Sequence, residues 1–257
     1  MKFSRLKALV YRDYLIFIKS RWRWLELFYF PITSIIIWGL FAIWTGEFAS
    51  EAGKIVLVIN VFWSYAYVVQ STINLSINED AWHSEAHHIF ITGVGKWEYL
   101  LGRIIFSLLI SSLNLFFMLL VTNLFFFNLA QISLELIPFI VLTVFLSVTL
   151  AILIAGLYFI LGRDYAWLAW ASLQFFILLS FPLSPLKILP YQAQVLARIM
   201  PYGNLFESLR NLLLSKPYFQ EMVFSVVVGL IYFFISILTY KFGFDYSRKT
   251  GKFAKMF

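Results

Sequence analysis

The sequence predicts an all-α membrane protein, and its composition, its charge-free intervals and the distribution of its basic residues support this prediction. Of the 257 residues, 61% are hydrophobic and 20% aromatic, whereas only 13% are charged. A soluble globular domain carries about 45–50% apolar and about 25% charged residues. A disordered chain would need the opposite balance of apolar and charged residues. The composition therefore excludes a soluble fold and a disordered chain.

Six charge-free intervals are each long enough to hold a membrane-spanning helix. The hydrocarbon core of a bilayer is about 30 Å thick, so a spanning helix needs about 20 apolar residues. We therefore expect six spans within a single membrane domain covering 1–257. The intervals are 27–46, 55–78, 104–134, 136–162, 165–186 and 222–240.

The basic residues predict the orientation of the chain. An excess of 20 Lys and Arg over 13 Asp and Glu would suggest nucleic acid for a soluble protein. In a membrane protein the same excess gathers in the cytoplasmic segments. An even number of spans places both termini on one side, and with both termini inside 15 of the 20 basic residues are cytoplasmic. We expect a multi-pass protein of the plasma (inner) membrane with cytoplasmic termini and no nucleic-acid partner.

Residues 2–22 have the pattern of an amphipathic helix. Arg5, Arg12 and Lys19 share one face at seven-residue intervals. Such a helix lies in the membrane interface with its basic residues toward the phosphate headgroups. The alternative is a basic anchor with no further role. The apolar residues that recur at helical spacing are Phe3, Leu6, Val10, Tyr14 and Phe17.

The segment between the second and third spans, 77–103, holds more acidic than basic residues. Acidic residues contribute little to topology, so another role is expected for them. We expect 79–90 to form one short helix with apolar and acidic groups, suited to docking a soluble partner. A solvated cytoplasmic turn is the alternative. The acidic residues are Glu79, Asp80, Glu85 and Glu98.

A histidine cluster in the same segment suggests a metal site. His83 and His87 are four residues apart, His88 is adjacent, and Glu85 lies between them. Histidine-box enzymes of membranes use several such clusters, whereas this chain has three histidines in all. We therefore expect no metal site, and a His-dependent intramembrane enzyme is the alternative of another class.

The segment 180–217 is interrupted by prolines, which forbid one uninterrupted helix. We expect two short amphipathic helices at 191–199 and 205–214, in a re-entrant hairpin over 181–215 that acts as an outer gate. Asn204 and Glu207 fit a helix start in which each residue caps the other's backbone. Glu207 and Arg210 are three apart and are expected to pair. A folded loop that only joins two spans is the alternative.

The second span carries many polar residues for a helix in lipid. Polar residues within spans face other helices or a pathway. No carboxylate or lysine lies centrally in the spans, which disfavours a proton relay and ion-coupled transport. The polar residues are Asn60, Ser64, Gln70, Ser71, Thr72, Asn74 and Ser76.

Three stretches share a pattern with one transporter family. They are FPLSPLKILPYQAQVLARIMPYGNLFESLRNLL at 181–213, ITGVGKWEYLLGR at 91–103 and LELFYFP at 25–31. Together with the order of the elements, they resemble the permease subunits of the ABC type-2 exporter family over nearly the full chain. The section NEDAWHSEAHHIF lacks the E-x-G-T-L pattern of many members. It is closer to a branch with an acidic pair, a Trp and a His-hydrophobic-Phe run.

The resemblance implies a membrane subunit that pairs with a second copy of itself, each bound to a separate ABC ATPase subunit. The chain has no G-x-x-x-x-G-K-[ST] phosphate loop, so it binds no cofactor itself, and ATP and Mg belong to the ATPase. The helix at 79–90 is then the coupling helix, and the first, second and fifth spans line the path. The docking residues are Glu79, Asp80, Trp82, His83, Glu85, His88 and Phe90. The outer-gate residues are Pro182, Pro185, Pro190, Pro201, Glu207 and Arg210. The path residues are Asn60, Ser64, Gln70 and Asn74.

The expected cargo is an amphipathic, lipid-like or drug-like compound. The chain has 9 Trp, 14 Tyr and 29 Phe. Such aromatic residues stack on sugars, which leaves a polysaccharide or lipid-linked glycan as the alternative cargo. Aromatic residues also fill the interfacial belts of membrane proteins. A structural or assembly protein of the membrane is a third class of function.

Overall fold

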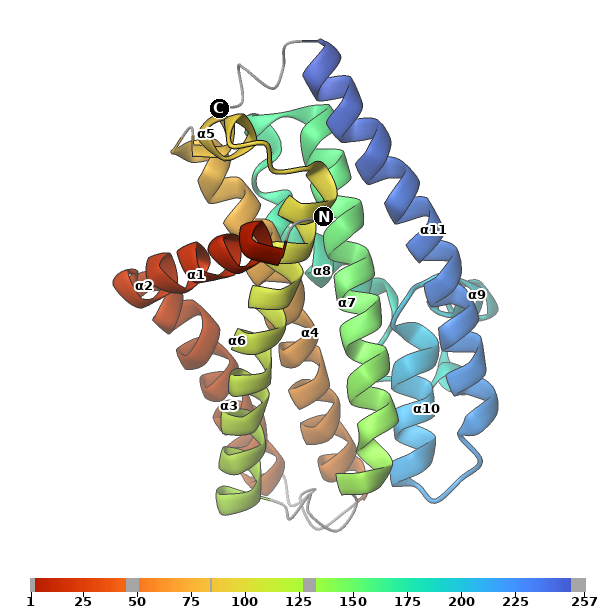
Figure 1. Ribbon diagram of the computed structural model, residues 1–257. Coiled ribbons are helices and arrows are strands. Elements are labelled where there is room, and N and C mark those ends of the chain that lie inside the picture. Colours follow the sequence, from red (N-terminus) through yellow and green to blue (C-terminus); the bar gives the residue numbers. More distant parts are fainter. Residues whose placement is uncertain (1–2, 45–50, 84, 127–132, 251–257) are drawn as a thin grey trace.

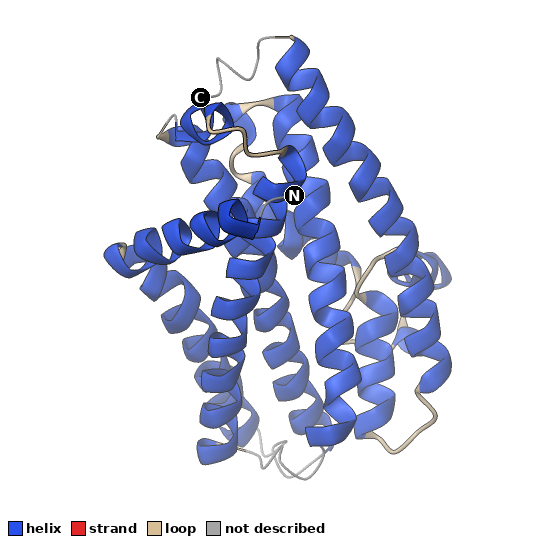
Figure 2. Ribbon diagram, viewed as in Figure 1, coloured by secondary structure: helices blue, strands red, loops and turns tan. Residues whose placement is uncertain are grey.

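The computed structural model describes residues 3–44, 51–83, 85–126 and 133–250. Every regular element within these ranges is a helix, and no strand occurs in them (Figure 2). The all-α prediction is therefore confirmed.

Four helices are long and apolar enough to cross a membrane, and they stand side by side in one bundle (Figure 1). Each contains about 30 residues and is more than 40 Å long at about 1.5 Å per residue, beyond the 30 Å of the hydrocarbon core. By length and composition, the chain is a multi-pass membrane protein. The four helices are α4 (Glu51–Trp82), α6 (Lys96–Phe125), α7 (Ser133–Leu161) and α11 (Phe219–Lys249).

The other two predicted spans contain shorter apolar helices. α3 (Phe30–Trp44) continues without a break from the short helix α2 (Arg21–Trp24) through a π-helical turn at Leu25–Tyr29. α8 (Leu168–Leu179) has 12 residues, or about 18 Å.

The interval 165–186 does house one helix, α8, but with 12 residues this helix is too short to confirm a fifth span. A 3₁₀ turn at Arg163–Tyr165 precedes α8, and irregular chain follows it. The helix stops because Phe181 adopts a left-handed conformation, with φ of 48°. Pro182 follows at once, has no N–H to donate and disfavours the helical conformation for the residue before it.

The predicted N-terminal helix is present as α1 (Phe3–Lys19), and it lies across α6 (Figure 1). The buried side of α1 differs from the predicted apolar face. Phe3 is 80% and Tyr14 48% exposed, so neither packs into the bundle. α1 instead packs on the bundle through a row of buried side chains that includes one carboxylate. The buried residues are Leu6, Leu9, Asp13 and Phe17.

The predicted single helix over 79–90 is wrong, because the chain divides it into two parts. Residues 79–82 form the last turn of α4, and a separate helix, α5, runs over Glu85–Ile91. The break follows Trp82, and Ser84 lies outside the described residues. A turn containing Gly93, with φ of 79°, then leads into α6.

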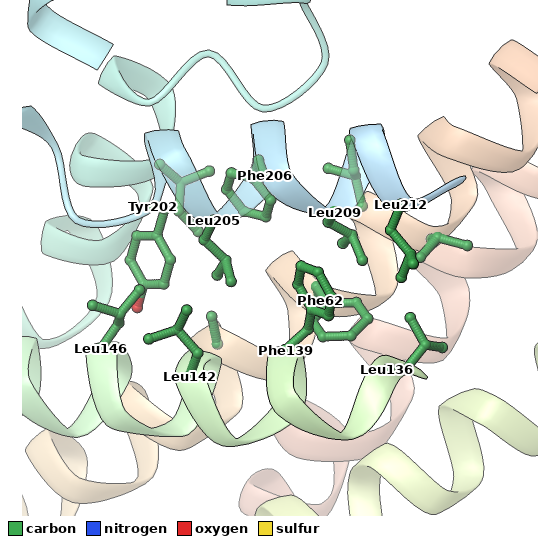
Figure 3. Close-up of a cluster of buried hydrophobic side chains, with 14 of the residues drawn as sticks. Phe62, Leu136, Phe139, Leu142, Leu146, Tyr202, Leu205, Phe206, Leu209 and Leu212 are labelled. Atoms are coloured by element: carbon green, nitrogen blue, oxygen red, sulfur yellow. The ribbon is translucent and has the colours of Figure 1, made fainter. Parts of the chain in front are cut away.

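The two predicted hairpin helices are confirmed as α9 (Tyr191–Ile199) and α10 (Gly203–Leu213), after a 3₁₀ turn at Leu186–Ile188. α10 runs antiparallel to the first half of α7, and their apolar side chains interdigitate (Figure 3). Phe62 of α4 closes the same cluster. The facing sets are Tyr202, Leu205, Leu209 and Leu212 on α10, and Leu146, Leu142, Phe139 and Leu136 on α7.

α7 and α11 approach each other closely at two glycines. A Cβ atom added at Gly156 would lie 2.6 Å from the backbone nitrogen of Tyr240, and one at Gly243 would lie 2.3 Å from the carbonyl oxygen of Gly156. Real Cβ contacts are not that short, so any larger residue would force the two helices apart. Gly229, elsewhere in the same interface, faces only side-chain atoms of Leu146 and Phe145.

We predict that Gly156→Ala destabilises the protein by about 1–3 kcal/mol, because the backbone of α11 cannot yield to the added methyl group. The matched control is Gly229→Ala, where side chains can move aside, so its loss is expected to be smaller. Thermal unfolding of both variants in the same detergent measures the difference. Equal Tm values for the two variants would contradict the close backbone contact.

Candidate functional site

A buried ion-pair network joins α1, α4 and α6 at the α5 end of the bundle. The Arg103 guanidinium on α6 donates to Asp13 of α1 through Nη1 and to Asp80 of α4 through Nη2. Arg103 and Asp13 are each 1% exposed and Asp80 is 2% exposed. Burying charges is costly unless they are paired, and here one cation bridges two carboxylates. The three helices are therefore held in one relative position.

A second arginine extends this network to α5. Arg12 donates to Asp80 and to Glu85, the first residue of α5. The Tyr99 hydroxyl also donates to Asp80, at 2.6 Å. Burial alone would lower the pKa of Arg12, but the hydrogen bonds and charges of Asp80 and Glu85 raise it above its ordinary value. Arg12 is therefore a permanent cation that ties α5 to α1 and α4.

Two further contacts hold the same end of the bundle. Arg23 of α2 makes a two-pronged ion pair with Glu79, its Nε lying 2.9 Å from Glu79 Oε1. Arg5 of α1 donates to the carbonyl oxygen of Gly93, at 2.5 Å, in the turn after α5. Two of the three basic residues expected to face lipid headgroups, Arg5 and Arg12, therefore bind this chain's own main chain and acidic residues.

The predicted docking residues separate into two groups. Glu79 and Asp80 bind arginines of the same chain, and Asp80 is buried rather than on the surface. Phe90 packs inward, with its ring centroid 5.1 Å from Tyr99 and 5.2 Å from Phe244.

The second group of docking residues is at the surface. Trp82 is 54% exposed, and Arg163 stacks over its ring at 4.1 Å. His83, Glu85 and His88 are also exposed. Ile91, which sequence reasoning did not single out, is an apolar residue of α5 that is 68% exposed.

A groove of about 500 Å³ has α1 on one side and, on the other, α5 with the turn that follows it. Apolar atoms make up most of its wall. Its polar side chains are those of Ser4, Arg5, Arg12, His88 and Thr92. Exposed α5 and this groove together form a continuous surface at one end of the bundle, which we call the α5 surface.

Three residues of the network were missed in the sequence. Asp13 is the lone acidic residue in an otherwise basic helix, and this was the one signal in the sequence that it pairs with a buried cation. Arg12 was assigned to the headgroups. Arg103 was counted only as a cytoplasmic positive charge, although it is fully buried.

The polar face of α10 is buried as well, and it binds the irregular chain of the hairpin. Arg210 donates to the carbonyl oxygen of Pro182 at 2.6 Å, and Glu207 accepts from the backbone N–H of Leu186 at 3.3 Å. Arg210 and Glu207 also pair with each other, as the spacing predicted. Side chains of α10 therefore satisfy main-chain groups that no helix pairs.

The predicted cap at Asn204 is wrong. α10 begins at Gly203, two residues before the predicted start at 205, and no side chain caps it. Asn204 instead donates to the carbonyl oxygen of Arg198 at 2.8 Å, at the end of α9. Glu207 is occupied by Arg210 and Leu186, as described above.

The predicted gate prolines lie at the ends of the short helices. Pro182 follows α8, and Pro185 directly precedes the 3₁₀ turn. Pro190 directly precedes α9, and Pro201 lies in the turn between α9 and α10.

The polar residues of α4 face other helices, as predicted. Gln70 donates to Asn74 at 2.5 Å and to the carbonyl oxygen of Ala169 on α8 at 3.3 Å. Asn74 donates to the carbonyl oxygen of Ala151 on α7 at 2.9 Å. Gln70 and Asn74 therefore hold α4 against α7 and α8.

Asn60 and Ser64 lie at a pocket of about 360 Å³ between α3, α4 and α8. Asn60 exchanges hydrogen bonds with Ser34 of α3 at 3.2–3.3 Å. Trp63 Nε1 donates to Gln174 of α8 at 3.1 Å. We call this the three-helix pocket. Of the four predicted path residues, the structure brings two to this pocket and uses the other two in helix packing.

Among the described residues, no group of three or more His, Asp and Glu side chains has an arrangement that could hold a metal ion. The side chain of His87 lies outside the described part of the structure.

We predict that Arg103→Met destabilises the protein by about 3–5 kcal/mol, because two buried carboxylates lose their shared cation. Lys96→Met is the control on the same helix, since Lys96 pairs with Asp245 at a more exposed site and should cost about 0–1 kcal/mol. Thermal unfolding in detergent measures both. A loss no larger than that of the control would refute the buried pairing.

We also predict that Arg210→Met lowers stability by about 3–5 kcal/mol, since it leaves Glu207 buried without its cation. The double variant Glu207→Gln/Arg210→Met should recover part of this loss, because the two residues interact directly. Arg198→Met, at an exposed position of α9, is the control and should stay within about 0.5 kcal/mol of the parent. Additive losses in the double variant would show that the pair is not coupled.

No protein-family model matches the chain, and no curated protein matches it.

Proposed function

We propose that the chain is the transmembrane subunit of an ATP-driven exporter of the ABC type-2 kind. In this proposal it acts in the plasma membrane as a dimer with a second copy of itself. A separate ATPase subunit binds on the cytoplasmic side and supplies ATP and Mg. The cargo is an amphipathic compound, and the chain itself is not an ATPase.

The α5 surface is the observation that carries this proposal. It is formed by the short helix α5, with exposed apolar and polar groups that include Ile91 and Glu85, beside the basic helix α1, and the exposed Trp82 ends α4 next to it. Glu85 of α5 is bonded to Arg12, which binds Asp80 at the end of α4. A partner that moves α5 therefore acts directly on α1 and α4. Transport by ATP requires contacts that differ between states, and this linkage supplies a route for them.

Six crossings are part of the proposal. The continuous helical run from α2 through α3 provides the first, and the four long helices provide the second, third, fourth and sixth. α8 covers only about half of a bilayer, and the hairpin completes the fifth crossing. The position of α10 along the first half of α7, away from α5, supports this assignment (Figure 1). The irregular chain of the hairpin is tolerated within the membrane because side chains of α10 form hydrogen bonds with its backbone N–H and C=O groups.

The orientation and the path follow from the same arrangement. With the α5 surface on the cytoplasmic side, the chain's termini are cytoplasmic and the hairpin closes the outer end of the path. The three-helix pocket lies between the first, second and fifth crossings, and supports the assignment of these helices to the path. In this conformation Asn60 and Ser64 contact the path directly, and Gln70 and Asn74 support its wall.

The test is complex formation with a co-expressed ABC ATPase subunit from the same source. We predict that the purified chain hydrolyses no ATP, that the co-expressed pair does, and that Ile91→Glu weakens assembly at least about tenfold. A charge buried in an apolar contact is costly, which is the reason for this loss. Analytical size exclusion and ATPase rates on the purified pair provide the measurement.

Ile188→Glu is the matched control, because Ile188 is also an exposed isoleucine but lies in the hairpin. It should leave assembly unchanged. If Ile91→Glu and Ile188→Glu assemble equally well, the α5 surface is not the docking site. If no ATPase subunit assembles with the parent chain, the proposed function fails.

A further inference from the structure

The three-helix pocket combines aromatic rings with uncharged polar groups. Its aromatic side chains include Trp38 of α3 and Trp63 and Tyr67 of α4. Its polar groups come from all three helices and include Ser34, Asn60 and Gln174. The volume of about 360 Å³ lies within the range of about 300–1,000 Å³ usual for small-molecule sites.

The polar groups of the pocket are oriented by bonds between helices. Ser34 and Asn60 join α3 to α4, and Trp63 and Gln174 join α4 to α8, at 3.1–3.3 Å. A carboxamide has two donor and two acceptor positions, so one partner does not use its full capacity. Asn60 and Gln174 therefore present amides at fixed positions, which suit ligand hydroxyl groups because hydroxyls both donate and accept.

Charge sets the second constraint on the ligand. Of the described residues that line the pocket, none carries a charge at neutral pH. An ion placed among these groups would lose its hydration without gaining a counter-charge, at a large cost. The buried charges described above lie elsewhere, in the network around Arg103 and in the hairpin. The pocket therefore selects against anions and cations.

Ring stacking sets the third constraint. The indole rings of Trp38 and Trp63 offer flat apolar faces with a polar N–H at one edge, and such rings bind ligands that are apolar on one side and hydrogen-bonding on the other. A sugar ring has this character, with C–H groups on its faces and hydroxyls around its rim.

We propose that the three-helix pocket binds an uncharged glycoside, the sugar ring stacking on tryptophan and its hydroxyls bonding to Asn60 and Gln174. This inference rests on the proposed exporter function and narrows its cargo to neutral sugar-bearing amphiphiles. An apolar aglycone extends toward the lipid, so the ligand is amphipathic as a whole.

The test compares two probes that share the same aromatic aglycone, 4-methylumbelliferyl β-D-glucoside and 4-methylumbelliferyl β-D-glucuronide. They differ only in a hydroxymethyl group against a carboxylate. Binding is measured by equilibrium dialysis on the full chain in lipid nanodiscs. We expect the glucoside to bind at least about tenfold more tightly than the glucuronide, because the carboxylate finds no cation in the pocket.

Variants locate the binding in this pocket. Trp38→Leu and Asn60→Leu should each weaken glucoside binding at least about fivefold, whereas Trp38→Phe keeps a ring and should retain most of it. Trp44→Leu is the matched control, since Trp44 lies on the same helix, is 82% exposed and does not line the pocket. Thermal unfolding of each variant shows whether it is folded, and the glucuronide comparison on the parent chain needs no variant.

Each opposite result overturns the inference. Equal or tighter binding of the glucuronide refutes an uncharged ligand, unchanged binding by Trp38→Leu and Asn60→Leu refutes the location, and binding of neither probe refutes the glycoside. A chain that assembles with its ATPase but binds neither probe leaves the exporter function standing without this cargo. A chain that binds the glucoside but no ATPase has the site without the exporter function.

Discussion

The pairing of Arg103 with two carboxylates sets the arrangement of the α5 end of the protein. The three charges come from α1, α4 and α6, and all three are buried. Removing one partner would leave an uncompensated charge, so none of the three helices can shift without the others. The position of α1 across α6 follows from this constraint, because Asp13 must reach Arg103. Lipid contact alone would leave α1 free to slide in the interface. The network therefore gives a surface helix a fixed place.

The hairpin also buries polar groups that need partners within the protein. Between α8 and α10 the backbone is partly irregular, and its unpaired groups need partners away from water. Glu207 and Arg210 supply them through Leu186 and Pro182, while the opposite face of α10 packs on α7. An amphipathic helix usually has its polar side in solvent. Here the polar side binds protein backbone instead, which explains why nearly all of α10 is buried.

The sequence predicted the features that depend on local spacing. Apolar run length found the four long helices, and proline positions found α9 and α10. A three-residue separation found the pair of Glu207 and Arg210. Prediction from the sequence failed where two partners are far apart in the chain, as with Asp13 and Arg103, which are 90 residues apart. It also failed where one residue's conformation decides, as with Phe181 at the end of α8. A charge-free interval indicates burial in lipid or protein and cannot distinguish a long helix from a short helix followed by folded chain.

α4 connects the network to the three-helix pocket in one unbroken helix of 32 residues. Asp80 lies in its last turn, and Asn60 lies 20 residues earlier, about 30 Å away along the axis. Between them, Gln70 and Asn74 bind the backbone of α8 and α7. These bonds join α4 to its neighbours along the length that separates Asp80 from Asn60. Coupling between distant sites requires such an element with two arrangements that both sites bias. In the proposed exporter, α5 biases α4 from one end and the bound glycoside biases it from the other.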